Sequence, residues 1–488
     1  MERYFVANKI LSLDMKLLKT SVFPFKVLAL VMVLIGVVNK TQAQKKKQAL
    51  PNIVFILADD LGYGDVGAYG QQHIKTPNID KLAKGGMKFT DFYAGSTVCA
   101  PSRAALMTGQ HTGRTYIRGN GELPLRPQDT ILPQRLKQLG YVNGMVGKWG
   151  LGLKGTTGAP EKKGWDFFTG HLHHLEGHFQ QSDSVWKIID GESKKVAVPK
   201  GTYLNELFTT DALHFIEQNK QHPFFLYVSY TLPHAELIAP IKYMAQYQNK
   251  DGSSIFGEET PQPTGRHYGP QPQPKAAYAA MITQMDDYIG MILAQLKKSG
   301  LEKNTIVIFT SDNGTHVEGG RLMKDVEGTF SSSGPLKGIK RDLYEGGIRV
   351  PFIVQWPAQV KANTTSNHVG AFWDLLPTFT AVAGAPVQSE EGISLLPALL
   401  RQQQPPQHQY LYWEFYEGGF KQAVRQGNWK AIRFHKGTIP ERTELYNLKE
   451  DISEQNNLAA RYPEKVQALE TLMDKARTPS ESPLFQIK

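Results

Sequence analysis

The sequence predicts an α/β fold with a large, mixed and mostly parallel sheet flanked by helices, followed by a smaller antiparallel sheet with one helix. Several apolar runs of strand length lack the polar alternation of a one-sided sheet, which is typical of strands covered on both faces. These runs lie at residues 52–58, 224–230, 305–310 and 350–356. Helical patterns separate them, and after about residue 385 short strand candidates alternate with glycine-containing turns.

The composition is that of an ordinary globular protein. Hydrophobic residues make up 41% and charged residues 20% of the 488 residues, so disordered, collagen-like and coiled-coil proteins are excluded. The formal net charge is +10, but the basic residues form no stripe or motif, so we expect no nucleic-acid partner. Cys99 is the single cysteine, which excludes a disulfide within the chain.

The first 43 residues have the pattern of a secretory signal peptide. An apolar run at residues 27–38 follows several lysines and is shorter than the roughly 20 residues that a bilayer span needs. Thr41-Gln42-Ala43 then offers a small-x-small cleavage site. We expect cleavage near Ala43, a periplasmic or secreted protein and no stable membrane anchor. The alternatives are an uncleaved anchor and a start at Met15 instead of Met1.

The remaining elements follow in order along the chain. Helices are predicted at residues 78–84, 102–107, 132–139, 205–218 and 275–298. In the last part, short strands are predicted at residues 410–415, 422–425, 429–433 and 444–447, with a helix at 463–476. The glutamine- and proline-rich stretch 402–409 is the expected connector. We therefore expect a large α/β domain at residues 44–385 and a smaller α+β subdomain at residues 386–488.

Carboxylates follow two of the apolar runs directly. Asp59 and Asp60 end the first run, and Asp312 and Asn313 end the third. Because ligands bind at the carboxyl ends of strands in open α/β sheets, these side chains are expected at one edge. Crowded carboxylates need a compensating cation, and oxygen ligands without thiolate or imidazole suit Ca²⁺ or Mg²⁺. The alternative is that these residues cap helices or turns.

The cysteine stands at a predicted helix start. Pro101 suits the first turn and Gly109 suits the end of that helix. Cys99 therefore lies at the positive end of the helix dipole, and Arg103 returns to the same face one turn later. This arrangement indicates an anion site with a reactive sulfur, the alternative being a small buried thiol.

The run Cys-x-Pro-Ser-Arg followed by Leu-x-Thr-Gly, at residues 99–109, resembles the hallmark of the type I, formylglycine-dependent sulfatases, arylsulfatase-like members of the alkaline-phosphatase-like superfamily. Further segments resemble that family in the same order, from about Asn52 to Asn457. They are Asp59-Asp60, Gly140-Tyr141 through Gly147-Lys148-Trp149, residues 225–234 with His234, Ser311-Asp312-Asn313-Gly314, Lys340 through Gly347, and residues 444–448.

The resemblance implies a mechanism and a set of site residues. A formylglycine-generating or anaerobic sulfatase-maturating enzyme would oxidise Cys99 to formylglycine, whose hydrated aldehyde is the nucleophile. The cation, Ca²⁺ or Mg²⁺, would be held by Asp59, Asp60, Asp312, Asn313 and the modified residue 99. With Arg103, it would lower the pKa of a hydroxyl of the hydrate. Lys148 and Lys340 would bind the sulfate oxygens, and His234 or Lys340 would protonate the leaving oxygen.

One position departs from the family pattern. Many members have histidine where this chain has Gly150, and that histidine contacts the formylglycine. A histidine-rich run follows at residues 171–178, and we hypothesise that His178, or another of these, replaces it. A solvated loop and a zinc site are the alternatives. His316 is expected either to contact substrate or to stabilise its turn.

The expected function is hydrolysis of sulfate esters by a secreted sulfatase. Secretion and the analogy to the family favour a sulfated saccharide over an aryl sulfate as substrate. One alternative is a phosphatase or phosphodiesterase of the same superfamily, which Asp312-Asn313 and Cys99 oppose. The other is a catalytically impaired glycan-binding homologue, which Gly150 keeps open.

Overall fold

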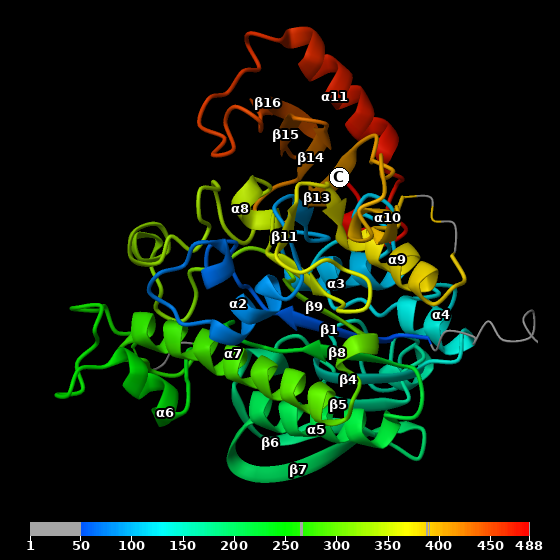
Figure 1. The fold of residues 1–488 in the computed structure, drawn as a ribbon. Helices are drawn as coiled ribbons and strands as arrows, with labels where there is room; N and C mark the ends of the chain where they lie inside the picture. Colours follow the sequence, from blue (N-terminus) through cyan, green and yellow to red (C-terminus); the bar gives the residue numbers. More distant parts are fainter. Residues whose placement is uncertain (1–49, 264–266, 387–388, 390, 488) are drawn as a thin grey trace, which may run out of the picture. The chain divides into compact units, whose positions relative to one another are not determined.

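Two sheets with different strand patterns organise the chain in the computed structural model (Figure 1). The structure describes residues 50–263, 267–386, 389 and 391–487, which belong to one compact unit. The predicted signal peptide and its cleavage site lie outside the described residues. None of the helices in the described part is both long and apolar enough to cross a bilayer.

The large sheet has ten strands in the order β11-β2-β10-β9-β1-β8-β4-β5-β6-β7. The four predicted runs are β1 (Asn52–Ala58), β8 (Phe224–Ser229), β9 (Thr305–Ser311) and β10 (Phe352–Gln355). Strand β1 pairs in parallel with β8 and β9, whereas β10 runs antiparallel to β9. The mixed, mostly parallel sheet predicted from the sequence is therefore confirmed.

The other strands of this sheet were not singled out as strands in the sequence. They are β2 (Met87–Phe89), β4 (Val142–Lys148), β5 (Phe167–His171), β6 (Gln181–Ile189), β7 (Glu192–Tyr203) and β11 (Thr364–Ser366). Strands β3 (Phe92–Tyr93) and β12 (Gly370–Ala371) pair separately. The long β6–β7 hairpin forms an edge and is only partly buried, so it lacks the continuous apolar run of a central strand.

Helices cover both faces of the large sheet (Figure 1). On one face lie α2 (Pro77–Lys84), α5 (Leu204–Asn219) and α7 (Pro274–Lys298), and on the other lie α3 (Cys99–Thr108), α4 (Leu132–Gln138) and α9 (Leu375–Val382). The shorter helices are α6 (Ile241–Met244), α8 (Glu345–Ile348) and α10 (Leu396–Leu399). Single turns are η1 (Gly67–Tyr69), η2 (Pro160–Lys162), η3 (Glu176–His178), η4 (Ala245–Tyr247), η5 (Glu302–Asn304), η6 (Asp325–Thr329), η7 (Phe372–Asp374) and η8 (Pro483–Phe485).

The second sheet has four antiparallel strands and one covering helix, as predicted. The strands are β13 (Leu411–Phe415), β14 (Lys421–Gln426), β15 (Trp429–Lys436) and β16 (Ile439–Asn447), and the helix is α11 (Pro463–Ala476). Leu469 and Met473 of α11 pack on one face of this sheet. Buried ion pairs join the sheet to the rest of the chain, with Arg118 Nη1 2.8 Å from Glu414 Oε1.

Candidate active site

The carboxyl ends of β1 and β9 bring an acidic cluster together. Residues Ala58 and Ser311 are paired in the parallel ladder, so Asp59 and Asp312 leave their strands side by side. Ligand oxygens of Asp59, Asp60 and Asp312 all lie within 4.8 Å of one another, and all three residues are fully buried. The backbone N–H of Asp60 donates to Asp312 Oδ1 at 3.0 Å. The sequence-predicted cluster is therefore a single buried group.

Three buried cations surround these carboxylates. Arg103 donates to Asp312 Oδ2 at 2.7 and 3.1 Å. Lys148 Nζ donates to Asp59 Oδ2 at 2.7 Å, and Lys340 Nζ donates to Asp60 Oδ2 at 2.6 Å. Burial alone would raise the pKa of Asp59, but Lys148 and other cations hold it well below its usual range.

The residues present fit a divalent cation. Burial and the charge of Asp59 raise the pKa of Asp312 to about 7, so the existing cations do not compensate this cluster fully. Asp59 Oδ1 and Asn313 Oδ1 are buried and make no hydrogen bond. Such oxygens call for a further partner, and a set of carboxylate and amide oxygens suits Ca²⁺ or Mg²⁺.

Cys99 opens α3 and lies beside the same cluster, and we use the name catalytic pocket for the group of Cys99, Arg103, Lys148, Lys340 and the three carboxylates. The side chain of Cys99 is buried, and burial raises the pKa of the thiol, which the nearby charge of Lys148 opposes. Asp59, Lys340 and Asp312 also act on this pKa, so the sulfur lies among the groups of the acidic cluster. Asn120 Oδ1 accepts from the N–H of Ala100 at 3.1 Å and lies 3.7 Å from Cys99 Sγ. Asn120 was not predicted, because nothing in its local sequence marks it.

Arg103 is held by partners on three other segments. Besides Asp312, its guanidinium donates to the backbone oxygen of Lys148 at 3.0 Å and to the hydroxyl of Ser229. The side chain is 1% exposed. The ends of β4, β8 and β9 therefore fix the guanidinium in one position beside Cys99.

A second group of polar residues lies around Lys340. Its ammonium donates to His234 Nε2 at 3.1 Å and lies 3.5 Å from Glu318 Oε1. His234 Nδ1 is hydrogen-bonded to the carbonyl of Ala235, so that nitrogen donates and Nε2 accepts. Burial alone would lower the pKa of Lys340, but Asp60 and Glu318 raise it well above its usual range. Lys340 therefore carries the proton of the pair.

Glu318 was not predicted as a site residue. It also accepts from Tyr268 at 2.8 Å and from Arg341 at 2.8 Å. Its position in the segment after Asp312-Asn313 was the only signal available in the sequence.

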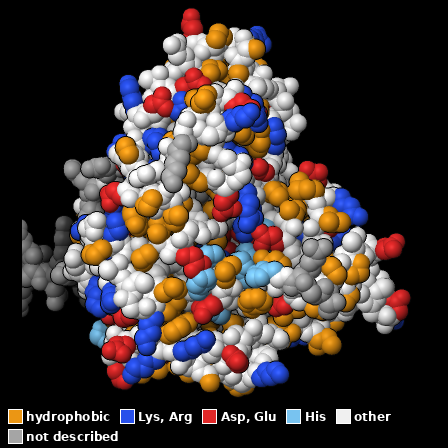
Figure 2. Space-filling view, turned by 180° about the vertical axis from the view of Figure 1, so that it is seen from behind, with side chains coloured by type: hydrophobic (Ala, Val, Ile, Leu, Met, Phe, Trp, Pro, Cys, Tyr) orange, Lys and Arg blue, Asp and Glu red, His pale blue; other side chains and the backbone are white. Residues whose placement is uncertain are grey.

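The histidine-rich run divides between different surroundings. Figure 2 shows histidine side chains gathered on one face, with acidic and basic side chains around them. The ring of His178 stacks on that of His234 at a centroid distance of 4.3 Å. Burial and His234 lower its pKa to about 2. His178 thus lies beside His234, the hydrogen-bond partner of Lys340.

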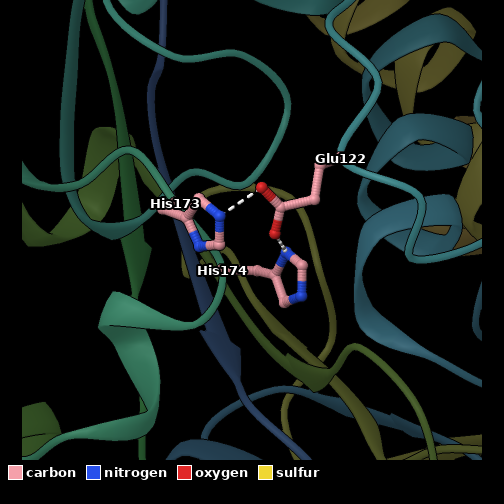
Figure 3. A group of neighbouring side chains, drawn as sticks. All are labelled: Glu122, His173 and His174. Atoms are coloured by element: carbon pink, nitrogen blue, oxygen red, sulfur yellow. Dashed lines mark ion pairs between the residues drawn. The ribbon is translucent and has the colours of Figure 1, made fainter.

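His174 is the residue that faces Gly150. A Cβ placed on Gly150 would lie 3.7 Å from the Cβ of His174. His174 Nδ1 is 2.9 Å from Glu122 Oε1, and the other oxygen of Glu122 contacts His173 (Figure 3). Burial and Lys148 lower the pKa of His174 to about 4, so the ring is neutral at pH 7. Because a carboxylate only accepts, Nδ1 donates and Nε2 keeps its lone pair.

His316 has both ring nitrogens engaged within its own surroundings. Nε2 donates to the carbonyl of Pro233 at 3.2 Å, and Nδ1 accepts from the N–H of Glu318 at 3.0 Å. The side chain is 1% exposed. Of the two expectations for His316, these contacts match turn stabilisation and leave no free nitrogen for a substrate.

Comparisons with known proteins agree on one family. The sulfatase family model matches residues 51–385, and the model of the N-sulphoglucosamine sulphohydrolase C-terminal part matches residues 339–478. N-acetylgalactosamine-6-sulfatase of Mus musculus is 32% identical over 408 residues, which cover 78% of this chain and 71% of that protein. Arylsulfatase A of Homo sapiens is 32% identical over 478 residues, covering 86% and 87%.

The chain also resembles a solved structure. Ps i-CgsB in complex with k-i-k-neocarrahexaose matches with a TM-score of 0.68 and 29% sequence identity. The match covers 87% of this chain and 91% of that one.

Proposed function

The chain belongs to the sulfatase family, and we propose that it is an exported enzyme that hydrolyses sulfate esters on carbohydrates. The family makes it a sulfuric ester hydrolase. Two similar proteins support a carbohydrate substrate. One is named an N-acetylgalactosamine-6-sulfatase, and the structure of the other was solved in complex with k-i-k-neocarrahexaose. One observation carries the proposal. The side chains of Cys99, Arg103, Lys148 and Lys340 are buried together around the carboxylates of Asp59, Asp60 and Asp312.

We propose that residue 99 is modified and that the acidic cluster holds a cation. A formylglycine made from Cys99 by a maturating enzyme would supply a hydroxyl nucleophile in its hydrated form. Ca²⁺, or Mg²⁺ in its place, would be held by Asp59, Asp60, Asp312, Asn313 and residue 99, and would supply positive charge at the sulfate oxygens. The buried oxygens Asp59 Oδ1 and Asn313 Oδ1, which make no hydrogen bond, support this assignment.

The chain's own cations bind and orient the ester. Lys148 and Lys340 are buried and positively charged, so each offers N–H donors to sulfate oxygens in a water-poor site. Arg103, fixed by Asp312 and Ser229, places its charge next to residue 99. These donors are held in place before substrate binds, which lowers the cost of reorganisation during the reaction.

Lys340 is proposed to protonate the leaving oxygen. It carries the proton of the Lys340–His234 pair, and His234 accepts from it through Nε2. His234 therefore orients the ammonium and receives its hydrogen bond, and Glu318 adds negative charge beside both. A positioned acid of this kind contributes about 10²- to 10⁴-fold in rate.

Two histidines are candidates for the base that is missing because this chain has Gly150 where many family members have histidine. His178 stacks on His234 and its Nδ1 lies 3.4 Å from the hydroxyl of Tyr268. His174 packs where a side chain at position 150 would begin, and Glu122 fixes its tautomer. Both rings are neutral at pH 7, as a base requires.

Export and the division of the chain complete the proposal. Residues 1–43 would be removed as a signal peptide, leaving a sulfatase catalytic domain at residues 44–385 and a smaller α+β subdomain at 386–488. N-terminal sequencing of the exported protein should find a start near Gln44. A mature chain that retains residues 27–38 would contradict it.

The proposal is tested by comparing sulfate and phosphate release. The protein, made together with a maturating enzyme, is incubated with 4-nitrophenyl sulfate and 4-nitrophenyl phosphate, with Cys99→Ala as control. Sulfate release by the unsubstituted protein, and none by Cys99→Ala, supports the proposed sulfatase activity. Phosphate release in preference would favour a phosphatase, and no release of either would favour a glycan-binding protein without activity.

The substrate class is then tested with defined saccharides. The panel holds N-acetylgalactosamine 6-sulfate, neocarrahexaose and shorter and longer members of each sulfated glycan series. A higher kcat/KM for at least one saccharide than for the aryl ester supports a carbohydrate sulfatase. An aryl ester that surpasses every saccharide would contradict it.

A further inference from the structure

A groove of about 360 Å³ lies next to the catalytic pocket, where β5 ends and β6 begins. Its lining includes His171, His173, Glu176, Phe179, Gln181 and Trp186. None of these residues has a part in the proposed chemistry. The groove has the size range of ligand-binding clefts.

The lining combines aromatic rings with polar groups. Phe179 is 37% exposed and Trp186 is half-buried, so part of each ring is open to the groove. Across the ladder from Trp186 stands Gly170, and the indole N–H donates to Glu176 Oε1 at 3.3 Å, which fixes the ring. A sugar ring has apolar C–H faces and hydroxyl edges, so a fixed aromatic face flanked by hydrogen-bonding groups matches it.

The charges in the groove do not favour a second sulfate. Glu176 and Asp183 are acidic, and Lys195 is the one lysine or arginine among the described residues of the lining. His171 is neutral at pH 7, because burial lowers its pKa to about 4. A sulfate group would meet more negative than positive charge here. The fitting ligand is therefore a sugar residue without sulfate.

His171 offers an unused hydrogen-bonding atom in this wall. Its side chain is 3% exposed and lines the groove, yet Nε2 has no hydrogen-bond partner in the structure. The ring is positioned by an edge contact with Phe208 at a centroid distance of 5.6 Å. Because buried polar atoms are normally paired, this nitrogen indicates a partner that arrives with a ligand.

The groove and the catalytic pocket share a wall. Lys148 and His171 are direct partners in the β4–β5 ladder, so about 4.8 Å separates their strands. Beyond them, His173 lines the groove while its neighbour His174 lies close enough to Lys148 and Asp59 for their charges to shift its pKa. Glu122 joins the two imidazoles (Figure 3). The groove therefore lies one strand away from Lys148.

We propose that the groove binds an unsulfated sugar residue of the same glycan chain whose sulfate ester is hydrolysed at the pocket of Cys99. The substrate is then an oligosaccharide or polysaccharide instead of a single sulfated sugar. This inference rests on the proposed sulfatase function and extends it to the substrate's length. Trp186 would be the stacking platform and His171 Nε2 a hydrogen-bonding partner of a hydroxyl group.

The test compares long and short esters in Trp186→Ala. For the best glycan series of the panel, kcat/KM of the unsubstituted enzyme should rise from monosaccharide to hexasaccharide. Trp186→Ala should lower kcat/KM for the hexasaccharide about tenfold and leave kcat/KM for 4-nitrophenyl sulfate unchanged. Trp429→Ala, which removes a half-buried tryptophan from the smaller sheet, should change neither value. Equal losses on both esters, or a kcat/KM independent of chain length, would overturn the inference.

A binding measurement separates this inference from the proposed function. Calorimetry with the Cys99→Ala protein uses desulfated hexasaccharides of the same series and needs no turnover. Binding that weakens about tenfold in Trp186→Ala, and also in His171→Phe, supports the groove. Equal affinity in all three proteins would overturn it. Absence of sulfate release from every ester would refute the sulfatase while this binding result stands independently.

Discussion

Replacing Arg103 tests whether one guanidinium holds the acidic cluster and the catalytic pocket together. The side chain is 1% exposed and donates to Asp312, to the carbonyl of Lys148 and to Ser229. Arg103→Ala leaves Asp312 buried beside Asp59 without its cation. Arg103→Lys keeps the charge but not the planar fork that reaches three partners.

The two substitutions should differ in size. Breaking a buried ion pair by removing one partner costs about 3–5 kcal/mol of unfolding free energy, which we expect for Arg103→Ala. Arg103→Lys leaves a buried acceptor unpaired and should cost about 1–3 kcal/mol. A Ca²⁺ ion bound at the proposed site would also compensate the charge of Asp312, so the loss in Arg103→Ala should be smaller with Ca²⁺ than with EDTA.

Urea unfolding followed by circular dichroism measures these differences, in EDTA and again in excess Ca²⁺. Arg442→Ala is the matched control, because this arginine is exposed and its surface pair should contribute less than about 1 kcal/mol. An Arg103→Ala protein within about 1 kcal/mol of the unsubstituted protein in EDTA would refute the reasoning.

Three further predictions concern the cation and the proton transfers. EDTA should abolish sulfate release and lower the midpoint of thermal unfolding, and added Ca²⁺ or Mg²⁺ should restore both; activity that persists in EDTA would argue against a cation. Lys340→Ala should lower kcat by about 10²- to 10⁴-fold. Lys340→Arg should also lower kcat, with a smaller change in KM than in kcat. An unchanged kcat in Lys340→Ala would exclude Lys340 as the acid. His174→Ala and His178→Ala separate the two candidate bases, since the variant whose kcat falls by about 10²-fold or more identifies the base and two unchanged values would exclude both.

Residues at the ends of apolar strands were predictable from the sequence. The runs that form β1 and β9 are continuous and buried, so their ends at Asp59 and Asp312 could be assigned to one sheet edge from the pattern of residues alone. The helix signals at Pro101 and Gly109 placed Cys99 at a helix start and Arg103 one turn later, and α3 indeed spans Cys99–Thr108. These predictions held because local pattern and global topology agree there.

The strands between these landmarks were harder to recognise. Strand β4 contains Gly144 and Gly147, and glycine is unfavourable in a strand interior. The structure shows why glycine is needed, because a Cβ on Gly147 would lie 1.8 Å from the carbonyl oxygen of Ser229. The close approach of β4 to β8 requires glycines, and these lower the strand propensity of β4 in the sequence. The same approach brings Lys148 to Asp59.

The positions of His174 and Glu122 depend on contacts between distant segments. Glu122 lies in a loop two residues after Asn120, whereas His174 follows β5, and no local pattern relates the two. The sequence hypothesis could name the histidine-rich run but not which member faces Gly150. For the same reason the sequence could not decide between substrate contact and turn stabilisation for His316, whose nitrogens bind backbone atoms.

The most direct test of the account is peptide mass spectrometry across residue 99 in preparations of known activity. The fraction of formylglycine at position 99 should rise in proportion to sulfate release per mole of protein, and unconverted protein should be folded but inactive. A preparation with full sulfatase activity and an unmodified thiol at Cys99 would contradict it.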